Sequence, residues 1–236
     1  MAPLRIAVLH QEVQLSDITG IDIFGNISKK YIAECTAAFP VFPNAELLAS
    51  QATEMQFLFV ADTLEPTEAT PGIKILPTHT YASCPVDDVD IMLIGGPLPH
   101  VRPAESLKLI RRFCERGESA TLMTTCVGSL WAAASGVLEG RRATTNRGAL
   151  VMARHYHGEA EWVDKRWVVD EAAGKVKLWT SGGAGAGLDM IQKYCFEKFG
   201  REIVEQALFG LDYEVNGRGE EYKEKLPEAW GGEPEA

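Results

Sequence analysis

Two hydrophobic patterns alternate along the chain. Short runs of consecutive apolar residues, typical of strands covered by helices on both faces of a parallel sheet, lie at residues 4–9, 56–61, 73–76, 90–94 and 119–123. Segments with apolar residues every three or four positions lie at residues 17–25, 105–116, 129–136 and 188–199 and predict helices. This alternation predicts an α/β fold with a doubly wound, mostly parallel sheet sandwiched by helices.

Two further segments complete the predicted architecture. Residues 166–170 and 175–180 flank Glu171-Ala172-Ala173-Gly174 and predict a small added β-hairpin. Residues 35–50 contain Pro40 and Pro43, show no clear period, and form either an insertion or a helix broken by loops.

Composition favours a single domain. The chain has 236 residues, 46% of them hydrophobic, enough for one substantial α/β core. We assign residues 1–215 to that domain and residues 216–236, which are charged and rich in glycine and proline, to a C-terminal tail. The apolar run near the N-terminus is too short for a signal peptide or a membrane span, so we expect a soluble, cytoplasmic protein.

Charge and cysteine content narrow the function classes. A formal net charge of -10 argues against a nucleic-acid or membrane partner. The five cysteines are scattered without a C-x-x-C pair, which favours reduced thiols over disulfides or a zinc site. His155 and His157 lack a third ligand at suitable spacing, so we expect no metal.

Cys126 lies where the 119–123 strand meets the 129–136 helix. A nucleophile elbow needs small residues two before and two after the nucleophile, and Thr124 and Gly128 occupy those places. A thiol at a helix N-terminus is stabilised as a thiolate, so we expect its pKa to fall below about 8.5. The alternative is a buried structural cysteine.

Three further groups follow predicted strands, at the edge of the sheet where ligands collect in doubly wound folds. Asp17 comes after the first strand and is either a partner of Cys126 or a helix N-cap. Gly95 and Gly96 allow close backbone approach to a ligand, or form an ordinary turn. Ser181 either lines the pocket or caps the next helix.

The motifs around these residues resemble those of the ThiJ/PfpI superfamily, in its isonitrile hydratase-like branch. The resemblance spans roughly residues 4–210. The matching segments are Leu15-Ser16-Asp17-Ile18-Thr19-Gly20, Gly95-Gly96-Pro97, Cys126-Val127-Gly128 with residues 132–145, and residues 179–190. The resemblance implies a flavodoxin-like fold, a homodimer, and a cysteine elbow beside a carboxyl group.

Carried over residue by residue, the resemblance makes Cys126 the nucleophile and Asp17 its acidic partner. It makes the backbone N–H groups of Gly96 and Val127 the oxyanion donors. Two positions depart from the pattern: Val127 stands where similar isonitrile hydratases have Thr and other members His, and Asn146 stands where many relatives have His. A Cys/His dyad is therefore not expected.

The residues and the resemblance together predict a cofactor-free enzyme acting on a small molecule. The first hypothesis is hydration of an isonitrile to an N-substituted formamide through a thioimidate on Cys126. The second applies the same cysteine and aspartate to another small molecule in a dehydration, cyclisation or aldehyde reaction, and Val127 favours it. The third is a non-catalytic redox-sensing or binding role.

Overall fold

The central sheet has seven strands and the order β10-β11-β7-β6-β1-β2-β5. The computed structural model describes residues 2–39, 41–98, 100–215, 217–227 and 230–231. All neighbouring strands run parallel except β10 and β11. The strands are β1 (Leu4–Leu9), β2 (Met55–Ala61), β5 (His79–Thr80), β6 (Ile91–Ile94), β7 (Thr121–Thr124), β10 (Trp167–Asp170) and β11 (Lys177–Ser181).

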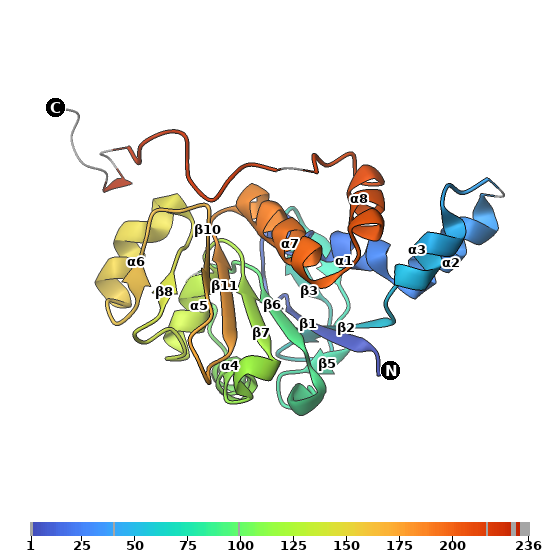
Figure 1. The fold of residues 1–236 in the computed structure, drawn as a ribbon. Coiled ribbons are helices and arrows are strands. Elements are labelled where there is room, and N and C mark those ends of the chain that lie inside the picture. Colours follow the sequence, from blue (N-terminus) through green and yellow to red (C-terminus); the bar gives the residue numbers. More distant parts are fainter. Residues whose placement is uncertain (1, 40, 99, 216, 228–229, 232–236) are drawn as a thin grey trace.

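Helices cover both faces of this sheet (Figure 1). One face packs against α1 (Ile21–Ile27), α7 (Ala184–Lys198) and α8 (Arg201–Phe209) through one hydrophobic cluster. The other packs against α4 (Ala104–Cys114), α5 (Gly128–Ala134) and α6 (Leu150–Tyr156) through a second cluster. The predicted flavodoxin-like, doubly wound fold is confirmed.

The hairpin and the short strands differ in detail from the prediction. The antiparallel pair β10–β11 extends the main sheet at its edge. The strand expected at residues 73–76 is β4 (Ile73–Ile75), which pairs with β3 (Thr67–Ala69) outside the main sheet. The main sheet instead ends at β5, whose two residues are too few to give a hydrophobic period. A further two-stranded sheet pairs β8 (Arg142–Ala143) with β9 (Glu161–Trp162).

The segment without a clear period forms parts of two helices. α2 (Lys29–Ala38) and α3 (Ala45–Gln51) are joined by a connection containing Pro43, while Pro40 lies outside the described residues. Figure 1 shows this pair at the end of the molecule opposite α6. Residues 35–50 therefore correspond to the broken-helix alternative.

α7 begins earlier than its apolar period predicts. The helix starts at Ala184, before the predicted segment 188–199, so a stretch rich in glycine forms its first turn. A Cβ on Gly187 would lie 2.7 Å from Thr125 Cγ2, which shows why this turn needs small residues. Asp189 lies beyond this first turn and is buried against Arg166.

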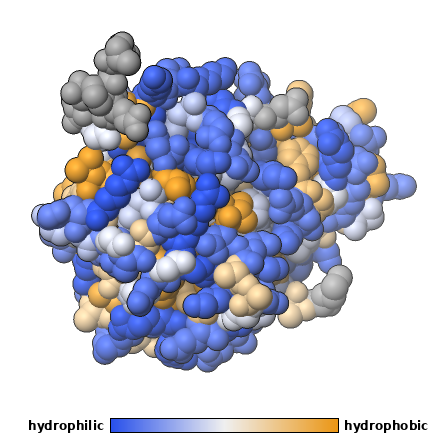
Figure 2. Space-filling view, turned by 60° about the vertical axis from the view of Figure 1, so that its left-hand side comes forward, coloured by the Kyte–Doolittle hydropathy of each residue, from blue (hydrophilic) through white to orange (hydrophobic). Residues whose placement is uncertain are grey.

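Residues 217–227 of the C-terminal segment run past α7 and β10 toward α6 (Figure 1). The Arg166 N–H donates to the Glu220 carbonyl over 2.7 Å, and the Arg147 guanidinium lies 4.0 Å from the centroid of the Tyr222 ring. The face shown in Figure 2 is largely hydrophilic with small hydrophobic areas. Among the helices of the described residues, none has the length and apolar character needed to cross a membrane.

Candidate active site

Cys126 occupies a strained turn between β7 and α5. Its φ is 58°, in the left-handed region that is uncommon for residues other than glycine. The Cys126 N–H donates to the Gly182 carbonyl over 2.5 Å. The Cys126 carbonyl accepts from the hydroxyls of Ser129 and Thr145, each over 3.1 Å. These bonds hold the strained residue in place, and the geometry is that of a nucleophile elbow.

Gly128 shows why the elbow needs a small residue two positions after the cysteine. A Cβ at this position would lie 2.3 Å from the Ile94 carbonyl oxygen and 2.8 Å from that of Gly95. Both atoms belong to the backbone of the neighbouring chain segment, so neither can move independently of β6.

Gly128→Ala is therefore expected to lower the free energy of unfolding by about 1–3 kcal/mol, the range for overpacking a rigid site. Gly25→Ala is the matched control, because Gly25 lies inside α1 with no atom within 4 Å of its added Cβ. It should raise stability by about 0.5–1 kcal/mol. Urea unfolding measures both changes, and an equal effect of the two substitutions would contradict the steric account.

Asp17 is buried at the carboxyl end of β1, with 2% of its surface exposed. Its Oδ2 accepts a hydrogen bond from the Gly96 N–H over 3.1 Å. Its Oδ1 has no hydrogen-bond partner among the described residues. α1 begins at Ile21 and is preceded by Gly20, so the alternative of Asp17 as a helix cap is wrong. Burial raises the pKa of Asp17 to about 6, and hydrogen bonds from Gly96 and Cys126 oppose the rise.

The pKa of Cys126 runs against our expectation of a stabilised thiolate. Burial, followed by the charge of Asp17, raises it to about 11. The Val127 N–H and the Asn146 amide stabilise the thiolate but do not compensate. α5 has seven residues, and its N-terminus does not offset the loss of hydration at a side chain this deeply buried. At neutral pH the site therefore holds a thiol beside a largely ionised carboxyl group.

The two expected oxyanion donors have different surroundings. The Gly96 N–H is already donated to Asp17, so it is not available to a substrate in this structure. The Val127 N–H interacts with the sulfur of Cys126. A Cβ on Gly96 would lie 2.8 Å from Asp17 Oδ2 and 3.0 Å from both Val127 N and Val127 Cγ2. Because Gly96 has no side chain, the Asp17 carboxyl group and the elbow can pack closely against the turn after β6.

Gly95 and Ser181 do not have the ligand-binding surroundings that we expected. A Cβ on Gly95 would lie 2.8 Å from Ile18 Cγ2 and 3.2 Å from Val13 Cβ, so this glycine allows close packing of the protein on itself. Ser181 is fully buried, and its hydroxyl donates to the Thr124 carbonyl over 3.0 Å. It ties β11 to β7, and neither the pocket-lining role nor the helix-cap role holds.

Asn146 is the residue of the site that our sequence analysis gave no role. Its Nδ2 donates to Cys126 Sγ over 3.4 Å, and its Oδ1 accepts from the Gly148 N–H over 3.0 Å. The only signal in the sequence was indirect, because the resemblance expects His at this position. Among the described residues, no group of three His, Cys, Asp or Glu side chains is arranged to hold a metal ion.

Asp17→Asn is expected to stabilise the fold at neutral pH. The pKa of Asp17 rises from 3.8 to about 6 on folding, so the folded state binds the proton more tightly than the unfolded state. The free energy of unfolding of the wild type therefore falls as pH rises between these two values. The shift corresponds to about 1–3 kcal/mol. Urea unfolding of both proteins at pH 4 and pH 7 measures it: the advantage of the variant should grow with pH, and a constant difference would contradict the raised pKa.

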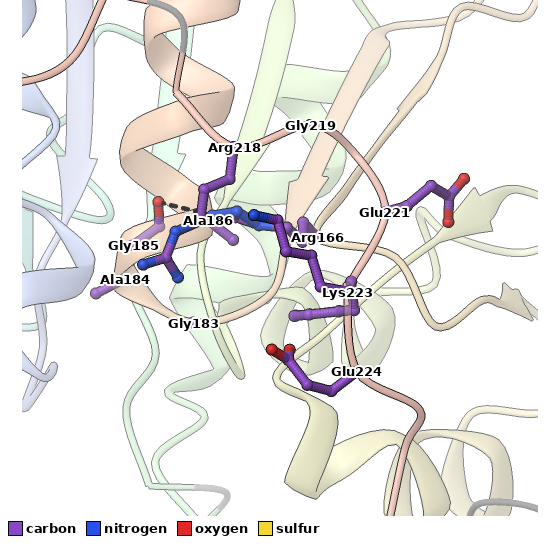
Figure 3. A pocket seen from close by; sticks show the side chains of 11 residues that line it. Arg166, Gly183, Ala184, Gly185, Ala186, Arg218, Gly219, Glu221, Lys223 and Glu224 are labelled. Carbon is purple, nitrogen blue, oxygen red and sulfur yellow. Dashed lines mark hydrogen bonds between the residues drawn. The ribbon is translucent and has the colours of Figure 1, made fainter.

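A cavity of about 470 Å³ lies next to this cluster, between the first turn of α7 and the C-terminal segment (Figure 3). Tyr222 connects the two: its side chain lines the cavity, and its hydroxyl would lie 2.3 Å from a Cβ on Gly182, the residue that accepts from Cys126. Burial raises the pKa of Tyr222, and the nearby Cys126 adds a smaller contribution. Tyr222 therefore links the cavity to the elbow that holds the thiol.

Comparisons with known proteins agree with this geometry. The DJ-1/PfpI family model matches residues 33–197. An isonitrile hydratase of Pseudomonas putida is 29% identical over 161 residues, which cover 68% of this chain and 67% of that protein.

Two solved structures share the fold. A ThiJ/PfpI family protein from Pseudomonas syringae has a TM-score of 0.68 at 22% identity, covering 91% of this chain and 76% of that one. Schizosaccharomyces pombe DJ-1 has a TM-score of 0.63 at 14% identity, covering 90% of this chain and all of that one. The extent of the family match and the cysteine elbow lead to one conclusion: the chain belongs to the DJ-1/PfpI family.

Proposed function

We propose that this protein is a cofactor-free hydratase that converts a small isonitrile to an N-substituted formamide. The observation that carries the proposal is the pairing of the Cys126 thiol with the buried Asp17 carboxyl group, whose Oδ1 has no partner among the described residues. An amide, that of Asn146, approaches the sulfur of Cys126. Similarity to an isonitrile hydratase supports the same chemistry.

The first half of the reaction adds the thiol across the terminal carbon of R–N≡C. Asp17 is about 90% ionised at pH 7 if its pKa is about 6, so it can accept the proton of Cys126. The thiolate sulfur bonds to the isonitrile carbon, and Asp17 returns the proton to that carbon. The product is a thioimidate, R–N=CH–S–Cys126, and Asp17 is again a carboxylate.

The second half hydrolyses this thioimidate. Asp17 takes a proton from water while the water oxygen bonds to the imidate carbon, and it passes this proton to the nitrogen. The tetrahedral carbon then expels the Cys126 thiolate while Asp17 takes the hydroxyl proton, and Asp17 returns that proton to the sulfur. The sum is R–N≡C plus H₂O giving R–NH–CHO. The Asn146 amide and the Val127 N–H stabilise the thiolate that leaves.

Val127 supports a second candidate, in which the same pair of residues acts on another small electrophile. Its apolar side chain lies against the Gly96 turn, and it lacks the hydroxyl that the resemblance to isonitrile hydratases expects at this position. A redox-sensing role is less consistent with the site, because sensor cysteines are exposed thiols with low pKa values. Cys126 is 9% exposed and its pKa is raised.

The test is turnover of cyclohexyl isonitrile in water enriched in ¹⁸O, followed by mass spectrometry. The proposal expects N-cyclohexylformamide carrying one ¹⁸O atom, formed much faster than without protein. Folded, fully reduced protein that gives no formamide from cyclohexyl or aryl isonitriles would refute isonitrile hydration and favour another electrophile.

A further inference from the structure

The cavity at the first turn of α7 carries three cationic side chains and two carboxylates on its wall. Its lining residues are Arg166, Gly183, Ala184, Gly185, Ala186, Arg218, Gly219, Glu221, Tyr222, Lys223 and Glu224. Figure 3 shows Arg218 and Lys223 on the same side as the first turn of α7, while Glu221 points away from it. The charged side chains of the wall thus sum to one positive charge, although the chain has a formal net charge of -10.

Arg166 is the buried element of this site. Its side chain is 8% exposed. Nη2 donates to Asp189 and to the Gly185 carbonyl, whereas Nη1 has no hydrogen-bond partner among the described residues. A buried guanidinium nitrogen without an acceptor costs stability, because its hydration is lost and not replaced. Arg166, which lines the cavity, therefore keeps one nitrogen whose two N–H groups lack an acceptor.

The first turn of α7 adds further donors. The first N–H groups of a helix have no partner within it, and Gly183, which precedes this helix, has no side chain to accept from them. The helix has 15 residues, so its dipole places a partial positive charge at the cavity. Backbone donors and a buried guanidinium thus face the same volume.

The local charges do not cancel. Arg166 is paired with Asp189, and Lys165 with Glu221 over 2.5 Å. The remaining side chains on the cavity wall are Arg218, Lys223 and Glu224, which leave one net positive charge in addition to the helix dipole. A monoanion would neutralise that charge and supply the acceptor that Arg166 Nη1 lacks.

We propose that this cavity binds the carboxylate of a small organic acid, and that the substrate attacked by Cys126 carries such a carboxylate. The volume of about 470 Å³ is within the range of small-molecule sites. The second half of the inference rests on the proposed hydratase function, whereas the binding site itself does not. A carboxylate held by Arg166, Arg218 and Lys223 would place the rest of the molecule past Tyr222 toward the thiol.

The binding site is tested by titration calorimetry of the wild-type protein with N-formylglycine and with its methyl ester. These two probes differ in the carboxylate and need no turnover. The acid should bind about ten-fold or more tightly than the ester, as expected for charge-assisted hydrogen bonds. Arg218→Gln and Lys223→Gln should each remove most of this preference and leave the affinity for the ester unchanged.

Lys225→Gln is the matched control, since Lys225 is exposed, lies in the same segment and does not line the cavity. It should leave the preference intact. Equal affinity for acid and ester, or an equal loss in the Lys225 and Lys223 variants, would overturn the site.

A separate turnover assay tests the substrate class. Isocyanoacetate should have a kcat/KM about ten-fold or more above that of methyl isocyanoacetate, and Lys223→Gln should reduce this ratio. Turnover of both at equal efficiency would overturn the inference about the substrate. Selective binding of N-formylglycine without turnover of any isonitrile would support the carboxylate site and count only against the hydratase.

Discussion

Cys126→Ala is expected to reduce formamide production from cyclohexyl isonitrile by about three orders of magnitude or more, to the level of the uncatalysed reaction. The sulfur is the atom that bonds to the isonitrile carbon in the proposed reaction, so no other group can replace it. The substitution should not disturb the fold greatly. The bonds that hold the elbow use the backbone N–H and carbonyl of residue 126, and alanine retains both.

Cys35→Ala provides the control for this experiment. Cys35 is a partly exposed thiol in α2, far along the chain from the elbow, and its loss should leave turnover unchanged. Intact-protein mass spectrometry during turnover should show wild type with an adduct of the mass of the isonitrile, and no such adduct on Cys126→Ala. Formamide production that survives in Cys126→Ala, or falls equally in Cys35→Ala, would exclude Cys126 as the nucleophile.

The fold could be predicted because its signals are local in the sequence. The apolar strands and the elbow at Cys126 follow from hydrophobic period and from small residues at fixed spacing. The errors arose where packing decides the structure. The first turn of α7 forms in a glycine-rich stretch because Gly187 lets it approach Thr125, and no local pattern reveals that contact.

The sequence predicted which residues form the site better than it predicted their pKa values. Asp17 and Cys126 follow different strands, and the parallel topology brings both to one edge of the sheet. The pKa of a thiol depends on how much water it loses, which a helix N-terminus in the sequence does not disclose. The same holds for Asn146 and Tyr222, whose positions near the thiol depend on contacts between distant segments.

Asp17→Asn is expected to lower kcat/KM for the isonitrile by about 10²–10⁴-fold, the usual contribution of a positioned acid or base. Asparagine keeps an acceptor for the Gly96 N–H but cannot take the proton from Cys126. In the wild type, activity should fall as pH drops through about 6, because the base must be ionised and its pKa is raised to that value. The variant should lose this acidic limb.

Asp17→Asn should slow turnover but increase the rate at which iodoacetamide alkylates Cys126. The charge of Asp17 helps to raise the thiol pKa, so Asp17→Asn should lower that pKa and speed alkylation at pH 8.5. Asp22→Asn is the matched control, because Asp22 is a carboxyl group in α1 whose pKa is also raised by burial. It should alter neither the pH profile nor alkylation. Slower alkylation together with slower turnover would indicate a damaged site. A retained acidic limb would show that Asp17 is not the base. Faster alkylation with slower turnover is the combination that a proton-transferring carboxylate beside a buried thiol requires.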